Sequence, residues 1–368
     1  MNTCTRSILL DILRCALGTQ ESLSYKVSDK EWAKLFDLCQ KQTIAGVVFI
    51  ALDKLSRVGQ KPPTPLLYEW IGLNEHIRQQ NEKVNRDVAE VVKEFENDGF
   101  DCVLLKGQGN NLMCPDRFSR SPGDIDMWVR RNGQNSGIKE TVRYVKYHNP
   151  TGNACYHHVD YGLFNGTEVE VHYRPAFMFR PKHNRRLQKW FAEKADEQYQ
   201  NKVELPNGVG NISVPTAEFN AVFQLSHVYN HLLHEGIGLR QIIDYFYVLR
   251  TIGNGQLTND NLSTTLKRLG LWGMAGAMMW VQSEVLGLED KYLIAPKDEK
   301  RGKIMLEEIM RGGNFGYYDA ENKKAKNRFR KNVQRIKRDL RMMRYFPSEC
   351  LWEPAFRIYH FLWRMRYN

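Results

Sequence analysis

The chain has 368 residues, 42% hydrophobic and 26% charged, which excludes a disordered chain and favours two domains or one core domain with large additions. Its seven cysteines are scattered without a Cys-x-x-Cys pair, which excludes the common zinc ribbons and argues against a disulfide framework. No apolar run approaches the ~18 residues of a membrane span, no signal peptide is recognisable, and the net charge of +11 lies in residues 323–368.

Residues 1–97 have a helical pattern throughout. The clearest helix is predicted over Leu73–Phe95, where apolar side chains recur at three-, four- and seven-residue spacing. The pair Asp98-Gly99 then supplies turn chemistry that ends this helix. We therefore predict an N-terminal helical region over residues 1–97.

Short strands are predicted after this region. They cover residues 100–105, 124–129, 156–164 and 167–173. The last two are separated only by Asn165-Gly166, the strongest short signal for a β-hairpin. Together these strands predict a core of mixed secondary structure over residues 98–215.

From Thr216 onward the pattern is helical again. Helices are predicted from Thr216 to Leu233, over Leu239–Leu249 and over about Thr258–Leu286. The C-terminal helical region therefore covers residues 216–368 and includes the basic tail from residue 323. The whole layout predicts an α+β fold in which a small mixed sheet is flanked by two helical regions.

The predicted strand at 124–129 carries two acids on one face. Side chains two residues apart in a strand point the same way and lie ~6.5 Å apart, so Asp124 and Asp126 share a face. Two neighbouring carboxylates repel each other unless a cation lies between them or one is protonated. Because oxygen ligands suit hard divalent ions, the pair favours a site for Mg²⁺ or Mn²⁺.

The second strand of the hairpin offers further ligands. Glu168, Glu170 and His172 share one face of this strand. A third carboxylate from it would complete a site for two metal ions ~3.5–4 Å apart, the arrangement used for in-line displacement at phosphorus.

A glycine-containing loop, Lys106-Gly107-Gln108-Gly109, follows the first predicted strand. Its backbone N–H groups can bind phosphates, with Lys106 as a charge partner. Neither this loop nor an isolated Asp-x-Asp pair is specific, because both also occur in solvated turns and strand edges. The order of apolar strand, glycine loop, Asp-hydrophobic-Asp strand and a neighbouring Glu-bearing strand favours a metal and phosphate site.

Three segments resemble a known family. They are CVLLKG at 102–107, DRFSRSPGDIDMWV at 116–129 and VEVHYR at 169–174. These segments are similar to the uncharacterised bacterial nucleotidyltransferase family, within the DNA polymerase beta-type nucleotidyltransferase superfamily. The stretch from His227 to Asp244 and, more weakly, the arginine-rich C-terminus also resemble this family. The resemblance covers most of the chain from about residue 30 onward.

The resemblance implies a nucleotidyltransferase-type sheet and a reaction that moves a nucleoside monophosphate from an NTP to an acceptor. Asp124, Asp126 and Glu170 would be the catalytic metal ligands for Mg²⁺ or Mn²⁺. Glu168 fits less well than Glu170 because it lies nearer the turn and follows Thr167 instead of a hydrophobic residue. The implied nucleotide-binding residues are Lys106, Gly107, Gln108, Gly109, Arg120 and Ser121, and further cleft contacts are expected from His172, Arg174, His227, His231 and Arg240.

The expected partners are an NTP, with ATP as the first choice, and an acceptor that is a small molecule, a protein or RNA. The nucleotidyltransferase superfamily usually has a Gly-Ser or Gly-Gly pair where the nucleotide phosphates bind. In this chain the corresponding loop reads Gly107-Gln108-Gly109. That departure leaves a second interpretation open, a non-catalytic nucleotide- or polyanion-binding protein on the same fold. The absence of a recognisable targeting or membrane segment predicts a cytoplasmic protein.

The helix that follows residue 216 carries three histidines. His227 and His231 face the same side, and His234 follows. No acid is placed as in the His-Glu-x-x-His zinc motif, so polar contacts near the sheet or the substrate cleft are the favoured role. Arg240 and Asp244 have the spacing of an ordinary ion pair on a helix surface.

The tail holds 14 lysines and arginines against three acids, which accounts for the whole net charge. A helix is predicted over residues 323–344, with a buried stripe formed by Phe329, Val333, Ile336, Leu340 and Met343. Lys331, Arg335, Lys337, Arg338 and Arg344 would lie on its remaining surface. A solvated basic face is the plain interpretation, and RNA or another polyanion, or a membrane surface, are the alternatives.

Overall fold

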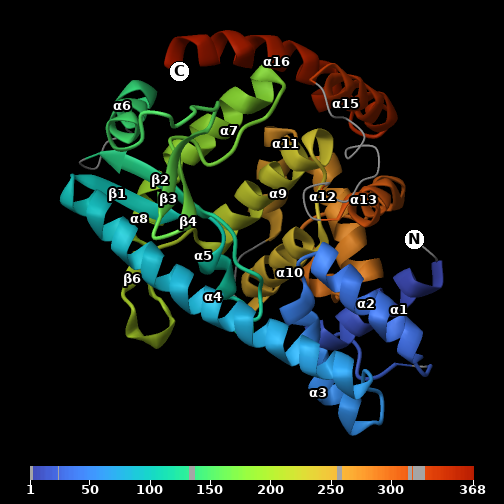
Figure 1. Ribbon diagram of the computed structural model, residues 1–368. Helices are drawn as coiled ribbons and strands as arrows, with labels where there is room; N and C mark the ends of the chain where they lie inside the picture. Colours follow the sequence, from blue (N-terminus) through green and yellow to red (C-terminus); the bar gives the residue numbers. More distant parts are fainter. Residues whose placement is uncertain (1–2, 24, 132–136, 255–258, 314–316, 318–327) are drawn as a thin grey trace.

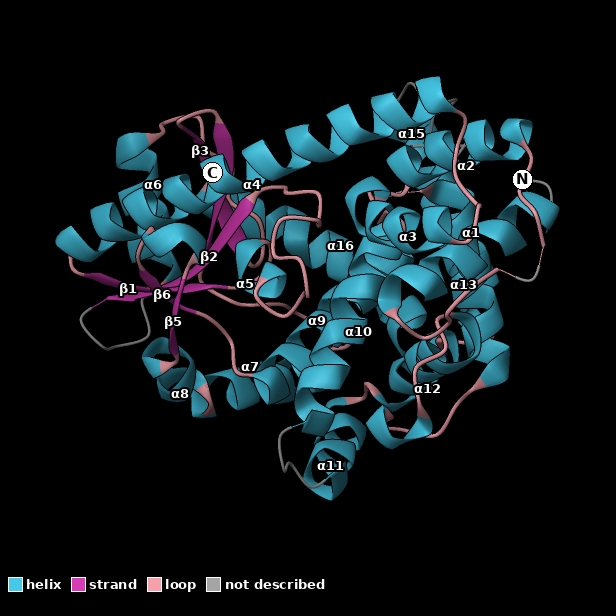
Figure 2. Ribbon diagram, turned by 90° about the horizontal axis from the view of Figure 1, so that it is seen from below, coloured by secondary structure: helices cyan, strands magenta, loops and turns pink. Residues whose placement is uncertain are grey.

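The computed structural model describes residues 3–23, 25–131, 137–254, 259–313, 317 and 328–368. The described part is an α+β fold in which a small mixed sheet is flanked by helices, as the sequence predicts (Figure 1). In Figure 2 the strands gather on one side of the molecule, and helices from both ends of the chain form the other side. None of the described helices is long and apolar enough to cross a membrane.

The N-terminal helices are α1 (Thr3–Leu17), α2 (Asp29–Lys41), α3 (Ala45–Arg57) and α4 (Thr64–Asn97). Helix α4 contacts α3 near its start and strand β1 near its end, so it connects the helical side to the sheet (Figures 1 and 2). It ends where the sequence predicts, because Gly99 adopts a positive φ of 83°.

The main sheet contains β1 (Phe100–Leu104), β2 (Ile125–Arg131), β3 (His158–Phe164) and β4 (Thr167–His172), in the order β1-β2-β4-β3. Strands β2 and β4 are parallel, whereas β1 and β3 run antiparallel to their neighbours. All four strands lie where the sequence places them. The hairpin is confirmed as well, because Asn165 and Gly166 both have positive φ, at 49° and 86°, as a type I′ turn requires.

Shorter elements surround the sheet. Helices α5 (Gln108–Asn111) and α6 (Ile138–His148) lie between the strands, and α7 (Pro181–Glu193) and α8 (Ala195–Gln200) follow β4. Strands β5 (Lys202–Glu204) and β6 (Asn211–Ser213) form a second, two-stranded sheet. The sequence pattern contains no indication of this pair, because three residues are too few to display an alternation.

The C-terminal helices are α9 (Ala217–His234), α10 (Leu239–Asn254), α11 (Asn259–Leu269), α12 (Trp272–Trp280) and α13 (Glu299–Gly312). The single helix predicted over about Thr258–Leu286 is wrong. It is broken at Gly270, whose φ of 80° ends α11, and a short π-helical turn over Val281–Val285 follows α12. A side chain at Gly270 would also collide with the His183 ring.

The tail forms α15 (Arg328–Met343) and α16 (Pro347–Tyr367). The helix prediction is confirmed from Arg328, whereas the predicted buried stripe is wrong at two positions: Ile336 and Leu340 are 49% and 64% exposed, and Arg338, Asp339 and Met342 are buried instead. Val333 and Met343 of the stripe are half-buried. The predicted helix residues 323–327 and the side chains of Phe329 and Lys331 lie outside the described part.

A buried acid on a neighbouring helix explains part of this rotation of α15. Glu308 of α13 is 3% exposed and pairs with Arg341 of α15 at 2.7 Å. Because a buried carboxylate needs a polar partner, the Arg341 side of α15 turns toward α13, and Ile336 and Leu340 turn outward. Asp339 is buried by the same rotation and faces Glu353 of α16, which is also buried.

The Asp339–Glu353 pair makes stability depend on pH. Burial and the neighbouring Glu353 raise the pKa of the Asp339 carboxyl group above its ordinary value of 3.8. Between the ordinary pKa of 3.8 and the raised pKa, the folded chain keeps a proton that the unfolded chain releases. The pair's contribution to stability is therefore greatest at acid pH and is lost as the pH rises from 3.8 through the raised pKa. We expect Asp339→Asn to raise the melting temperature more at pH 8 than at pH 5, by about 2–4 °C for each ~1 kcal/mol gained.

A thermal melt at the two pH values measures this difference. Glu307→Gln is the matched control, because it replaces an exposed acid on α13 and should change the melting temperature little at either pH. A larger gain for Asp339→Asn at pH 5 than at pH 8 would contradict the sign of the effect.

Candidate active site

Asp126 and Glu170 lie side by side at the centre of the main sheet. They are register partners on the parallel strands β2 and β4, whose backbones run ~4.8 Å apart. His172 bridges them, because its Nε2 atom lies 2.9 Å from Asp126 Oδ1 and 3.3 Å from Glu170 Oε2. One ligand atom from each of these three residues lies within 4.8 Å of the others. The structure thus brings together two of the three predicted acids and one predicted cleft contact.

Asp124 lies just before β2 and is half-buried. Among the described residues, the group within 4.8 Å that contains Asp126 and Glu170 does not include Asp124. Its side chain instead faces two hollows, a small cavity that it shares with Asp126 and a large cleft that it shares with Glu170. Asp124 therefore lies at the entrance to the acidic pair.

Lys106 neutralises the acidic pair from the end of β1. Its Nζ atom lies 2.9 Å from Asp126 Oδ1 and 3.4 Å from Nε2 of His227, one of the predicted cleft contacts. Burial opposes the charged form of Lys106, but the carboxylates of Asp126, Asp124 and Glu170 outweigh it and raise the lysine pKa. The pKa of Asp126 is lowered against the cost of burial, by Lys106 and then by His172.

One oxygen of Asp126 remains available. Asp126 is 1% exposed, and its Oδ2 atom is buried with no hydrogen-bond donor among the described residues. The pKa of Glu170 is also low: burial would raise it, but the hydrogen bond from His172 and the charge of His158 lower it to about 2. Two neighbouring ionised carboxylates, one of which has an unsatisfied oxygen, fit a hard divalent cation.

The predicted phosphate loop is a single helical turn in the structure. Gly107 has a φ of 55°, and α5 begins directly after it. The side chain of Gln108 points into the protein, where its Nε2 atom donates to Asn85 Oδ1 at 2.6 Å. Gly109 packs against Val214. Lys106 and Gly107 therefore line the cavity beside the acids, whereas Gln108 and Gly109 are not among its lining residues.

Arg120 and Arg240 converge on the same small cavity. Arg120 forms a bidentate pair with Asp244, at 2.7 and 2.9 Å, and both side chains are buried. Arg240 donates through Nη1 to the Ser121 carbonyl oxygen at 3.2 Å, and burial and the charge of Arg120 lower its pKa to about 10. The prediction that Arg240 and Asp244 form an ion pair on a helix surface is wrong, because both side chains lie in the interior.

The cavity that these residues line has a volume of about 30 Å³, enough for only one or two water molecules. Arg120, Arg240 and Ser121 therefore hold the segment before β2 against α10. The contacts that the structure shows for them are internal ones.

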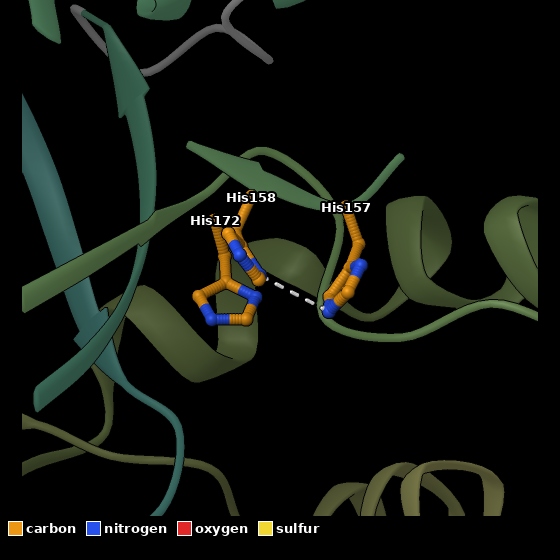
Figure 3. Close-up of side chains that lie close together, drawn as sticks. All are labelled: His157, His158 and His172. Carbon is orange, nitrogen blue, oxygen red and sulfur yellow. Dashed lines mark hydrogen bonds between the residues drawn. The ribbon is translucent and has the colours of Figure 1, made fainter. Parts of the chain in front are cut away.

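Two histidines that the sequence analysis did not single out complete the surroundings of Glu170. His158 Nδ1 lies 3.2 Å from Glu170 Oε2 and 3.2 Å from His157 Nε2 (Figure 3). Burial would lower the pKa of His158, but its hydrogen bond to Asp160 and the charge of Glu170 raise it to about 10. Burial and the neighbouring His158 lower the pKa of His157 well below the usual range. The signal that could have indicated them is two adjacent histidines in the predicted strand 156–164, which the Asn165-Gly166 turn joins to the strand of Glu170 and His172.

Of the remaining predicted cleft contacts, His227 and His231 line the large cleft, whereas Arg174 is not among its lining residues. The rings of His227 and His231 lie 4.3 Å apart on α9, and His231 Nδ1 is 3.2 Å from Glu235 Oε2. Within the described part of the chain, no possible metal-binding group includes His227, His231 or His234. Arg174 donates to the Tyr156 carbonyl oxygen at 2.6 Å and lies over the Tyr156 ring.

A cleft of about 1110 Å³ opens beside the acids. Lys106, Asp124 and Glu170 line one wall, and the tail supplies Arg335, Arg357 and Arg364 on another. Helix α16 extends back toward the sheet, where Asn368 Oδ1 accepts a hydrogen bond from the Ala154 backbone N–H at 2.7 Å. The basic tail thus forms part of the cleft, and pockets of this size hold nucleotide-sized ligands.

A family model and a solved structure show some similarity to this chain. No curated protein matches the sequence. A crystal structure of an antigenic nucleotidyltransferase-like protein from Paracoccidioides brasiliensis is 14% identical, with 60% of this chain and 96% of that chain covered. Its TM-score of 0.31 is too low to support an inference about this chain. The family model described as "Uncharacterised nucleotidyltransferase" matches residues 28–287, so the chain belongs to that nucleotidyltransferase family.

Proposed function

We propose that the protein moves a nucleoside monophosphate from an NTP to a hydroxyl or phosphate acceptor and releases pyrophosphate. In this proposal Asp126 and Glu170, with Asp124 at the cleft entrance, hold Mg²⁺ or Mn²⁺. The observation that carries it is the pairing of Asp126 with Glu170 beside an open cleft, with Asp126 Oδ2 unsatisfied among the described residues. Family membership supports the same class of reaction.

The donor set fits the proposed ion. The available atoms are carboxylate oxygens, the ligands that Mg²⁺ and Mn²⁺ prefer. When bound, such an ion would neutralise phosphate charge and lower the pKa of the attacking group. The acids themselves would be kept ionised by Lys106 and His172, which hold the pKa values of Asp126 and Glu170 low.

Lys106 is the residue best placed to contact the phosphates. Its side chain lines both hollows, and its charge is maintained by the three acids. A fixed cation at this position would stabilise the negative charge that develops on the leaving pyrophosphate. In the proposed reaction Lys106 therefore exchanges part of its contact with Asp126 for a contact with the triphosphate.

Metal-dependent transfer of label tests the proposal. The full chain is incubated with α-³²P-labelled NTPs and cell extract, with Mg²⁺, with Mn²⁺ or with a chelator. We expect label to appear on an acceptor only when a divalent ion is present, with ATP as the first donor to try. Binding of NTP without any metal, together with no labelled product, would overturn the proposal.

One observation favours a second candidate function. Lys106 and His172 already compensate Asp126 without a metal ion, so the acidic pair is stable as a purely structural feature. A non-catalytic protein that binds a nucleotide or another polyanion through its basic cleft would have this arrangement. Equal nucleotide affinity with and without Mg²⁺ would favour this candidate over the transferase.

The tail arginines should speed the capture of an anionic ligand. We expect the combined substitution Arg335→Glu and Arg364→Glu to slow the association of a fluorescent ATP analogue about tenfold at low salt, because fixed charge along a cleft attracts anions. Turnover at saturating NTP should change less. The difference should shrink as salt screens the charges.

Stopped-flow measurements of the association rate test this prediction. The matched control is Lys337→Glu with Arg344→Glu, which makes the same change in net charge at exposed tail residues that do not line the cleft. If the control slows association as much as the cleft variant, the effect is one of net charge alone.

A further inference from the structure

Beside the proposed magnesium site, the sheet carries a second group of ligand atoms of a different chemistry. His157, His158 and His172 each place one ring nitrogen within 4.8 Å of the others (Figure 3). His158 opens β3 and His157 directly precedes it, and His172 ends β4 opposite His158. Imidazole nitrogens are poor ligands for Mg²⁺ and good ligands for zinc and its neighbours in the first transition series.

Three spacings among these atoms and Glu170 are compatible with a tetrahedral site. His157 Nε2 is 3.2 Å from His158 Nδ1, His158 Nδ1 is 3.2 Å from Glu170 Oε2, and Glu170 Oε2 is 3.3 Å from His172 Nε2. A tetrahedron with metal–ligand bonds of ~2.0–2.1 Å has edges of ~3.3 Å. Three of the six edges of such a tetrahedron are therefore already present as hydrogen-bond or ion-pair contacts, so a zinc ion could replace the shared protons with little movement of the side chains.

We propose that His157, His158 and His172, together with Glu170, bind a single zinc-class transition-metal ion. The site is distinct from the magnesium site in its ligands, although the two share Glu170. It does not rest on the proposed transfer reaction, because the binding of the ion is measured without nucleotide.

The surroundings of the histidines suit such a site. His172 is 1% exposed and the side chain of His158 is 12% exposed, so the rings are held by packing before any ion binds. The second ring nitrogen of His172 lies 3.4 Å from the Arg174 carbonyl oxygen, and His158 Nε2 lies 3.3 Å from Asp160 Oδ1. Outer contacts of this kind orient histidine ligands in metal sites. The large cleft, which His157, His158 and Glu170 line, provides the route by which an ion enters.

Zinc affinity in the presence of excess Mg²⁺ tests the proposal. The full chain is stripped with a chelator, and Zn²⁺ is titrated against a chromophoric competitor in millimolar Mg²⁺, which occupies the carboxylate site. We expect one tightly bound zinc per chain. Removing one ligand, as in His157→Ala or His158→Ala, should weaken binding by at least about 100-fold, because even the loss of an outer contact costs 10–100-fold.

His76→Ala is the matched control, because it removes an exposed histidine on α4 outside the cluster and should leave zinc affinity unchanged. Cobalt provides a test that needs no variant. Co²⁺ bound to the unaltered chain should show the intense visible bands of tetrahedral coordination, which an octahedral site of oxygen ligands does not produce.

Three results would overturn the proposal: wild-type zinc affinity in His157→Ala, displacement of zinc by millimolar Mg²⁺, or only weak octahedral cobalt bands. Any of them would leave His157 and His158 as a hydrogen-bonded pair. Mg²⁺-dependent NTP binding is measured separately on the same protein. If the chain binds zinc tightly but shows no Mg²⁺-dependent NTP binding, only the proposed function is contradicted. If it shows Mg²⁺-dependent NTP binding but no tight zinc binding, only the zinc site is contradicted.

Discussion

Glu170→Gln is expected to slow nucleotidyl transfer about a thousandfold, because a metal ion supplies several kcal/mol of transition-state stabilisation and ~1.4 kcal/mol corresponds to a factor of ten. The glutamine keeps the shape of the side chain but removes a charged oxygen from the proposed metal site. Glu168→Gln is the matched control, two residues earlier on the same strand, where the side chain is exposed. We expect the control to transfer label at close to the wild-type rate.

Asp126→Asn should also slow transfer strongly. Unlike Glu170→Gln, it should in addition lower the stability of the fold. Lys106 would lose its ionised partner in a buried position, so this variant should also unfold at lower temperature. A thermal melt of each variant therefore accompanies the assay. Full transfer activity in Glu170→Gln, with the Mg²⁺ requirement retained, would remove Glu170 from the metal site.

Asp244→Asn is expected to lower the free energy of unfolding by about 3–5 kcal/mol, the usual cost of removing one partner from a buried ion pair. Asp244 is 5% exposed, and its two oxygens accept the bidentate pair of hydrogen bonds from Arg120. Without the charge of Asp244, the charge of Arg120 would remain buried and uncompensated. Arg240, which lines the same cavity, would add to the repulsion.

Urea denaturation followed by circular dichroism measures this change. The matched control is Asp53→Asn, which breaks an exposed pair with Arg57 on α3, where the two side chains are 70% and 74% exposed. Such a pair contributes ~0.5 kcal/mol or less. The double substitution Arg120→Met with Asp244→Leu should recover much of the loss, because the buried charge of Arg120 is then removed together with its partner and Arg240 loses the repulsion from Arg120. A loss for Asp244→Asn no larger than that of the control would show that solvent reaches this pair.

The Arg120–Asp244 pair also illustrates how a residue's role depends on packing. The sequence places Arg120 near the acids, and the structure confirms that it lines the cavity beside Asp126. Its partner, however, lies more than a hundred residues further along the chain, on α10. No local pattern links the two positions, so the prediction of a surface pair between Arg240 and Asp244 could not be corrected from the sequence.

The sequence by itself determined the strands, the hairpin and the shared face of Glu170 and His172. These features follow from short-range rules: a strand alternates its side chains, and Asn-Gly adopts the positive φ angles of a tight turn. The period of two also placed Asp126 on the face opposite Ile125, Met127 and Val129. Local periodicity therefore placed each acid on a face of its own strand. The choice of Glu170 followed from the family resemblance, and its pairing with Asp126 depends on the parallel contact between β2 and β4.

Only the tertiary structure decided which groups surround those acids. The tight turn alone would set His158 opposite Tyr173, but an irregularity in β3 between Asp160 and Gly162 shifts the register by one residue and brings His158 opposite His172. In the same way, the apolar stripe of α15 predicted its buried face only in part, because the buried Glu308 on α13 pairs with Arg341 on the other side of the helix. A single register shift and a few buried charges are long-range energetic effects, and a local periodicity carries no information about them.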